Sequence, residues 1–156
     1  MTALRVLDVP ADRMEGEVVA ALFFEDVRPL HGAAALLDWR LNDRLTRMLL
    51  DEEVSGCVGE QVLVNNNGKL AADYVLFVGG GCWRGMDVDR YRELLRHLLG
   101  VCSKAGFSLV SLCFTTTSFM PADMLEQEIG RALSDLSGNR PECLLSFDND
   151  DPSAGG

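Results

Sequence analysis

The chain has 156 residues, of which 24 are acidic and 14 basic, giving a net charge of −10, and 47% of its residues are apolar. This length suits one domain that buries a sizeable core, and the composition excludes disordered and fibrous proteins. The negative charge disfavours nucleic acid and anionic membranes as partners.

The first third of the chain predicts two strands and a helix. The apolar runs Ala3–Val9 and Val18–Phe24 have the length and composition of strands, and the segment 11–17 between them is turn-like. A long helix is then predicted over Gly32–Leu50, because its main apolar positions fall on one arc at helical spacing: Ala34, Leu37, Leu41, Leu45, Met48 and Leu49.

A second apolar side of this predicted helix carries Leu36, Trp39 and Leu50. A helix with two apolar sides is either sandwiched or used in an interface. These three residues are therefore the candidate interface of a homodimer or another homo-oligomer.

The remaining elements alternate between strands and helices. After a strand at Gln61–Val64 and a turn at 65–68, the uninterrupted apolar run in Asp73–Val78 predicts a fully buried strand. Asp87 is a suitable N-cap for an amphipathic helix over Val88–Ala105. A strand at Ser108–Phe114, a loop at 115–119, a helix from Pro121 to about Leu136 and a strand at Glu142–Phe147 complete the series.

This order predicts an α/β fold of three αβα layers, with a mixed and mostly parallel sheet. Residues 1–147 would form a single domain, and 148–156 an acidic disordered tail.

Other sequence features indicate a cytoplasmic protein without metal sites. No apolar run approaches the ~20 residues of a membrane span, and the N-terminus lacks a signal peptide. The five cysteines are odd in number and include no C-x-x-C pair, so they are expected to be reduced.

Three segments together resemble a known family. They are Leu37-Asp38 with Leu41 and Leu45, then Gly56-Cys57-Val58-Gly59-Glu60, then Tyr74-Val75-Leu76-Phe77-Val78-Gly79. In this order they resemble the N-terminal domain of the leucyl, or cytosol, aminopeptidases. Two positions depart from the family pattern: Cys57 replaces a lysine, and Gly80-Gly81-Cys82-Trp83 replaces a glycine-lysine pair.

The resemblance implies a macro-domain-like fold and no catalytic residue. In that family the two-metal peptidase centre lies in a following domain with an Asn-Thr-Asp-Ala-Glu-Gly-Arg signature, and this string does not occur here. We therefore expect no peptidase activity and no cofactor. The chain would act as an interaction, assembly or regulatory module, or as an accessory subunit of a leucyl aminopeptidase partner.

The best candidate for ligand binding is the glycine loop, with Gly79, Gly80, Gly81, Trp83 and Arg84. Glycine-rich loops that lead into a helix expose N–H groups to phosphates, and related macro domains hold ADP-ribose in this way. Arg84 would add charge and Trp83 would stack on a base. The alternative is that the glycines only permit a tight connection, with Trp83 capping the core.

Three weaker candidates carry structural explanations. Cys82 would be a nucleophile only if it bonded His31 or His97, but His97 is expected to face solvent and His31 to help start a helix. The acids from Asp148 to Asp151 lack the glycine and glutamate of a calcium loop. The hydroxyl-rich segment 115–118 follows a strand end, where ligands often bind, but it also suits a helix lead-in.

Overall fold

The computed structural model describes residues 4–66 and 68–152. Its strands are β1 (Leu4–Val6), β2 (Val18–Phe23), β3 (Gln61–Asn65), β4 (Tyr74–Gly79), β5 (Leu109–Thr115) and β6 (Glu142–Asp148). Its helices are α1 (Gly32–Arg40), α2 (Arg44–Leu50), α3 (Val88–Ala105) and α4 (Ala122–Ser134), with a short 3₁₀ turn, η1, at Ala11–Arg13. None of the described helices is both long enough and apolar enough to span a membrane.

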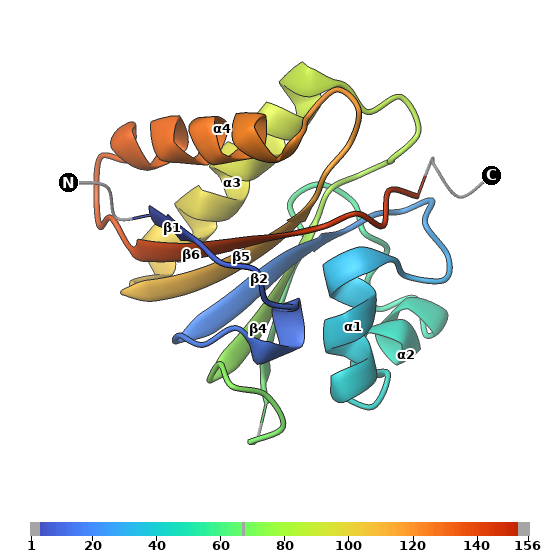
Figure 1. The fold of residues 1–156 in the computed structure, drawn as a ribbon. Helices are drawn as coiled ribbons and strands as arrows, with labels where there is room; N and C mark the ends of the chain where they lie inside the picture. Colours follow the sequence, from blue (N-terminus) through green and yellow to red (C-terminus); the bar gives the residue numbers. More distant parts are fainter. Residues whose placement is uncertain (1–3, 67, 153–156) are drawn as a thin grey trace.

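The six strands form one sheet between two layers of helices. The strand order is β1-β6-β5-β2-β4-β3, and every neighbouring pair is parallel except β3 with β4. Helices α3 and α4 lie on one face of the sheet and α1 and α2 on the other (Figure 1). The predicted three-layer α/β architecture with a mixed, mostly parallel sheet is confirmed.

Strand alternation explains the two cores. In β4, Leu76 and Val78 join the core under α3 and α4, whereas Val75 and Phe77 join the core under α1 and α2. All four are buried because the strand is covered on both faces, which is why its sequence is apolar without alternation.

A topological switch point lies between β2 and β5. These strands are neighbours, but the chain leaves β2 towards α1 and β3, and leaves β5 towards α4 and β6 on the opposite face. Connections that part in this way leave a crevice at the carboxyl ends of the strands, where open α/β sheets bind their ligands.

The predicted single helix over Gly32–Leu50 is wrong, because the structure has two helices there. The chain turns at Asn42 and Asp43, whose φ angles of 58° and 61° are left-handed, a conformation that Asn and Asp tolerate better than most residues. The buried carboxylate of Asp38 accepts hydrogen bonds from the Leu45 amide at 2.6 Å and from the Thr46 hydroxyl at 2.5 Å. Asp38, a residue of α1, thereby caps the N-terminus of α2.

The predicted turn-like segment 11–17 belongs partly to the core. Ala11 and Met14 are each only 1% exposed and pack under α1. In the turn that was predicted at 65–68, Gly68 has a φ of 82°, and Asn67 lies outside the described residues.

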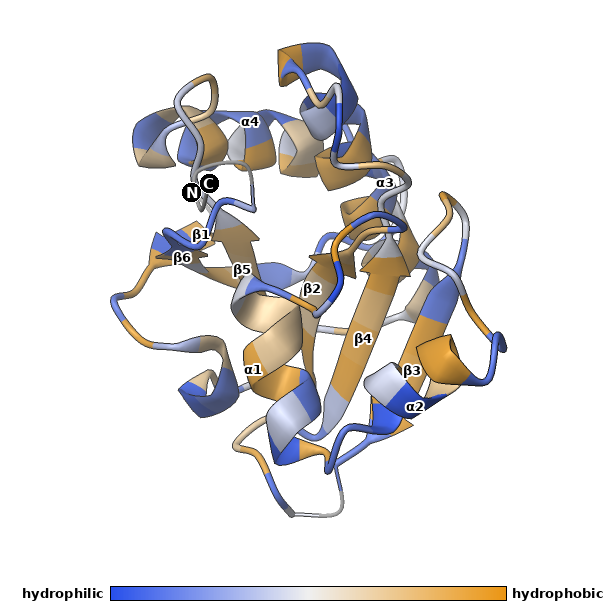
Figure 2. Cartoon of the chain, turned by 90° about the vertical axis from the view of Figure 1, so that its right-hand side faces the viewer, coloured by the Kyte–Doolittle hydropathy of each residue, from blue (hydrophilic) through white to orange (hydrophobic). Residues whose placement is uncertain are grey.

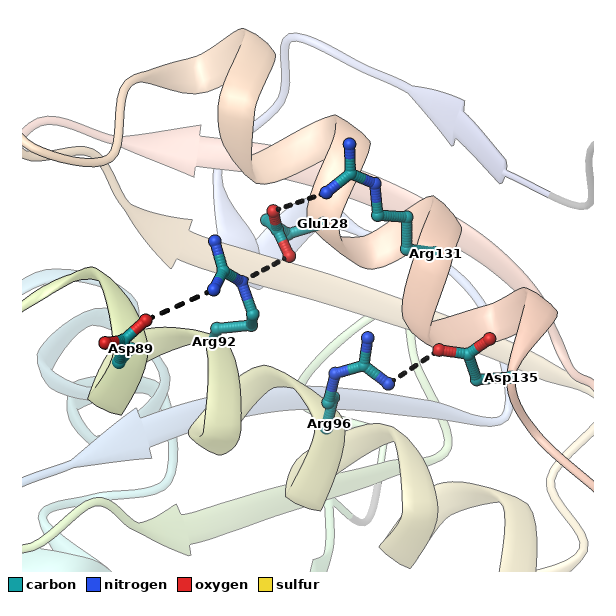
Figure 3. A network of polar contacts seen from close by, with 6 residues as sticks. All are labelled: Asp89, Arg92, Arg96, Glu128, Arg131 and Asp135. Carbon is teal, nitrogen blue, oxygen red and sulfur yellow. Dashed lines mark hydrogen bonds and ion pairs between the residues drawn. The ribbon is translucent and has the colours of Figure 1, made fainter.

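An ion-pair network joins α3 to α4 (Figure 3). The Glu128 side chain, 4% exposed, accepts a 2.8 Å bond from Arg92 Nε and a 3.3 Å bond from Arg131 Nη1. Arg92 is about one third exposed and Arg131 about two thirds. The Glu128 carboxylate is therefore held mainly by Arg92, because the bond from Arg131 is longer and the Arg131 side chain is more exposed to water.

Replacing Arg92 should cost more stability than replacing Arg131. Arg92→Ala leaves a buried carboxylate with one weak partner, and we expect the free energy of unfolding to fall by about 2 kcal/mol. Arg131→Ala should cost under about 1 kcal/mol. Urea denaturation of the two variants measures the difference, and equal losses would contradict this account of the network.

Candidate functional site

A cavity lies at the switch point. Its volume is about 30 Å³, room for roughly one or two water molecules. Aromatic residues Phe24, Trp83 and Tyr91 line one part, and the polar lining residues are His31, Thr115, Asp148 and Asp150. The location is that of a ligand site in this class of fold, but the space in this conformation is too small for a nucleotide.

The N-terminus of α1 opens onto this cavity and is occupied by the chain's own carboxylates. Asp150 Oδ2 accepts a 2.9 Å bond from the Gly32 amide, and Asp148 Oδ2 accepts a 3.1 Å bond from the Ala33 amide. A helix N-terminus favours negative charge, so these two aspartates fill the position where an anion would bind. Gly32 is needed here, because its φ is 60° and a Cβ atom would lie 2.8 Å from Asp148 Oδ2.

The prediction of a disordered tail from residue 148 is corrected for its described part. Asp148 ends β6 and is half-buried, and its Oδ1 accepts a 2.8 Å bond from the Thr115 hydroxyl. The Thr116 hydroxyl donates to Asn149 at 2.8 Å. The hydroxyl-rich segment 115–118 thus helps to hold the acidic segment against α1. Residues 153–156 of the predicted tail lie outside the described residues.

The backbone amides of the three glycines in the glycine loop all donate hydrogen bonds within the protein. The Gly79, Gly80 and Gly81 amides donate to the carbonyls of Glu60, Phe23 and Gly56 at 2.8–2.9 Å. A Cβ atom would lie 2.1 Å from the Cys57 carbonyl oxygen at Gly79, and 2.4 Å from the Phe24 ring at Gly80. Close packing of neighbouring segments therefore explains the glycines at positions 79 and 80, and a positive φ of 77° explains the glycine at position 81.

The other two loop residues are held by Asp26. Its carboxylate accepts the amides of Trp83 at 2.6 Å and Arg84 at 2.9 Å. Burial acts to raise the pKa of Asp26, but these two bonds outweigh it and the pKa is lowered. Trp83 is 7% exposed and packs edge-on against Phe24 and Tyr91, so it caps the core.

Of the five predicted ligand-binding residues, Trp83 alone lines the switch-point cavity. Gly79, Gly80, Gly81 and Arg84 lie outside it, and ligand binding through the loop stays a prediction. Asp148, Asp150 and Tyr91 were missed as cavity residues. Tyr91 donates from its hydroxyl to the Thr115 carbonyl at 2.6 Å, and burial raises the pKa of this phenol. Only the acids after the last predicted strand gave a signal in the sequence.

The structure separates Cys82 from both histidines. The exposed Cys82 thiol donates to Glu25 at 3.5 Å, and this bond, burial and the nearby acids raise the pKa of the thiol. His31 Nδ1 lies 3.5 Å from Asp150. The expectation that His97 faces solvent is corrected: the side chain is half-buried, and its buried Nε2 has no hydrogen-bond partner.

The other cysteines differ in burial. Cys57 is half-buried, whereas Cys102, Cys113 and Cys143 are buried, and burial raises the pKa of each of these three thiols to about 12. Such thiols stay protonated and unreactive at neutral pH. Within residues 4–66 and 68–152, no three His, Cys, Asp or Glu side chains gather as metal ligands would.

The predicted interface residues do not share one helix face. Trp39 lies in the last turn of α1 and is 66% exposed, and Leu50 ends α2 and is 76% exposed. Leu36 is half-buried and packs against the core under α1 and α2. Because the helix breaks at residues 41–43, the surface that the sequence placed on one helix is divided between two.

Comparison with known proteins gives the same family for the sequence. The family model described as "Cytosol aminopeptidase family, N-terminal domain" matches residues 21–133. A "Probable cytosol aminopeptidase" from Glaesserella parasuis is 29% identical over 112 residues, covering 72% of this chain and 22% of that protein. One from Actinobacillus pleuropneumoniae is 26% identical, covering 77% of this chain and 26% of that protein. The chain thus spans about a quarter of the length of these relatives.

Solved structures give the same fold. A tomato leucine aminopeptidase mutant aligns with a TM-score of 0.65 and 16% identity, covering 95% of this chain and 32% of the other. A macrodomain of Trypanosoma brucei aligns with a TM-score of 0.70 and 19% identity, covering 97% and 64%, and a crystal structure of the macrodomain in complex with ADP-ribose aligns with 0.67 and 16%, covering 97% and 66%. At these identities the likeness concerns the fold alone, and it confirms the predicted macro-domain-like fold.

Proposed function

This chain belongs to the cytosol aminopeptidase family, whose N-terminal domain it matches, and we propose that it acts as a non-catalytic assembly or regulatory module. One observation carries the proposal: the sequence match lies in the N-terminal domain, and the described residues of that domain bring no set of metal ligands together. A binuclear peptidase centre needs several convergent ligands around two metals.

The proposal predicts that the purified chain does not cleave peptides. With leucyl-arylamide substrates and added manganese or zinc, we expect release of arylamine no faster than in buffer with the same metal. A complete cytosol aminopeptidase, assayed alongside, supplies the positive control. Metal-dependent turnover that follows the chain through every purification step would overturn the proposal.

The partner of such a module is another protein chain. Trp39 and Leu50 offer large exposed apolar side chains, which favour association, either with further copies of this chain or with an aminopeptidase to which it would be an accessory subunit. We place the protein in the cytoplasm, in keeping with the family name and with free cysteines. Co-purification with a peptidase chain and a change in that peptidase's turnover would favour the accessory role.

A second candidate function is binding of a small anionic ligand such as ADP-ribose. The location of the cavity at the switch point favours it, as does the likeness of the fold to a macrodomain crystallised with ADP-ribose. Against it stand the small volume of the cavity and the occupation of the α1 amides by Asp148 and Asp150. A ligand phosphate would have to displace these two carboxylates.

The double variant Asp148→Asn/Asp150→Asn tests this second candidate. Removing two negative charges from the α1 N-terminus should raise the affinity for ADP-ribose by about tenfold over the wild type. Isothermal titration of both proteins measures the change. Absence of heat from both proteins at saturating ligand would end the candidate, and equal affinities would show that the aspartates do not compete.

A further inference from the structure

The two edges of the sheet differ in how they are protected. Strand β1, at one edge, has only three residues and includes the charged Arg5. Strand β3, at the other edge, has five residues, Gln61–Asn65, with no charge and no proline. Proteins normally guard edge strands with short length, charges or prolines, because an unguarded edge pairs with another strand. The β3 edge lacks these guards.

The backbone of β3 presents hydrogen-bonding groups to its outer side. The Gly79 amide donates to the Glu60 carbonyl, and the Asn66 amide donates to the Asp73 carbonyl, so the even-numbered residues of this segment bond towards β4. Bonded positions alternate along an antiparallel pair. The N–H and C=O groups of Gln61 and Leu63 therefore point away from β4, and no described strand lies beyond them.

Apolar surface accompanies this edge. Leu63 is 54% exposed on the sheet face that carries α3, and Val58, just before β3, is 62% exposed. The exposed Leu50 ends α2, which covers the other face of the sheet, where its Leu45 joins the core that contains Val62 and Val64 of β3 (Figure 2). A large exposed leucine at the centre of an edge strand is a feature that a partner strand would cover.

A groove runs between the β3 edge and α3. Its volume is about 440 Å³, and its lining residues are Gln61, His97, Gly100, Val101, Lys104 and Ala105. The buried His97 Nε2 has no hydrogen-bond partner, and such a group costs free energy unless an incoming polar group reaches it.

We propose that a second copy of this chain pairs with β3, antiparallel and around a two-fold axis at Leu63, to continue the sheet from one copy into the other. This inference rests on the proposed assembly role and names its surface. Pairing around Leu63 lets its outward N–H and C=O bond the same residue of the second copy. In this register Asn65 of the second copy would lie opposite Gln61, at the edge of the groove.

The absence of charge on β3 makes this edge the place where a second copy can pair without facing like charges. Two chains of net charge −10 repel each other over most of their surface. An antiparallel β3 pair brings together two uncharged strands, so no like charges face each other along it. The one acid that directly precedes the strand, Glu60, already accepts the amides of Ser55 and Gly56 in its own chain. Lys104 in the groove adds a local positive charge.

Leu63→Lys tests the pairing, with light scattering behind size-exclusion chromatography as the measurement. The wild type should have the mass of two chains, and the variant should dissociate at least about tenfold more readily, because two lysines would face each other across the axis. Val6→Lys, at an exposed position on the opposite edge strand, is the matched control and should leave the dimer intact. Thermal unfolding checks that both variants are folded.

Leu63→Pro provides an independent reading. It removes the outward N–H of residue 63 without removing a hydrogen bond inside the monomer, so it should also yield monomers. In the wild type, hydrogen exchange at Leu63 should slow as the protein concentration rises. A monomeric wild type, or a Leu63→Lys variant with an unchanged dimer, would overturn the inference.

Trp39→Lys separates failure of this inference from failure of the proposed function. If Trp39→Lys dissociates the dimer and Leu63→Lys does not, the assembly role stands and the α1 surface carries it instead. The peptidase assay gives its answer whatever the oligomeric state. Turnover by the chain would remove the proposed function even if β3 pairs as described.

Discussion

Gly79→Ala should unfold the domain or lower its free energy of unfolding by about 3 kcal/mol or more. The new Cβ atom would lie 2.1 Å from the Cys57 carbonyl oxygen and 2.9 Å from the Gly56 carbonyl oxygen. Both atoms are backbone, so neither moves without shifting the loop before β3. The same shift would break the bond from the Gly79 amide to the Glu60 carbonyl.

Gly100→Ala is the matched control for this substitution. Gly100 lies inside α3, and nothing comes within 4 Å of the position of its Cβ atom. Alanine is the better helix former, so this variant should gain about 0.5–1 kcal/mol. Urea denaturation, with equal m-values as a check for two-state unfolding, compares the two variants. A Gly79→Ala protein as stable as the wild type would show that the loop yields easily.

Asp38→Ala should lower the free energy of unfolding by about 2–3 kcal/mol. The buried carboxylate of Asp38 is the cap of α2, and without it the Leu45 amide, also buried, loses its partner. The Thr46 hydroxyl loses its 2.5 Å bond to the same carboxylate. The loss should appear in urea denaturation and as faster hydrogen exchange in α2 than in α3.

Two further variants make the Asp38 experiment specific. Asp38→Asn keeps one acceptor oxygen and should recover part of the lost stability. Asp43→Asn changes an aspartate at the same helix break, but its side chain forms no capping bond, and asparagine also tolerates the left-handed conformation. It should therefore change stability by no more than about 0.5 kcal/mol. A loss as large as that of Asp38→Ala would mean that charge, not capping, holds the break.

These capping and packing roles explain the motifs that carried the family resemblance. Asp38 of the Leu37-Asp38 pair caps α2, and Glu60 closes its loop by accepting the Ser55 and Gly56 amides. Burial acts to raise the pKa of Glu60, but the backbone bonds prevail and the pKa is lowered. Gly79 lets that loop lie against the end of β4. In the sequence these residues are only a motif, and the structure shows which hydrogen bond or close contact requires each of them.

Local sequence information was sufficient for most of the fold. The spacing of apolar residues and the positions of turn residues predicted the strands and helices in their observed order. This works because the spacing of apolar residues depends on whether one or both faces of an element are buried. The break between α1 and α2 escaped this reasoning. Its cause is a side chain, Asp38, that bonds amides seven and eight residues later, while the apolar period continues unbroken across the break.

The sequence by itself determined the fold class, the family and the order of elements in this protein, since these follow from periodicity and from short-range motifs. Only the tertiary structure decided which amides are already bonded, and which carboxylates fill the end of α1. The glycine loop and the acidic segment at 148–150 show the reason. Their hydrogen-bond partners lie far away in the sequence. The glycine loop bonds to Glu60 and Phe23, and the acidic segment bonds to Gly32 and Ala33. Such pairings exist only once the sheet has brought strand ends together.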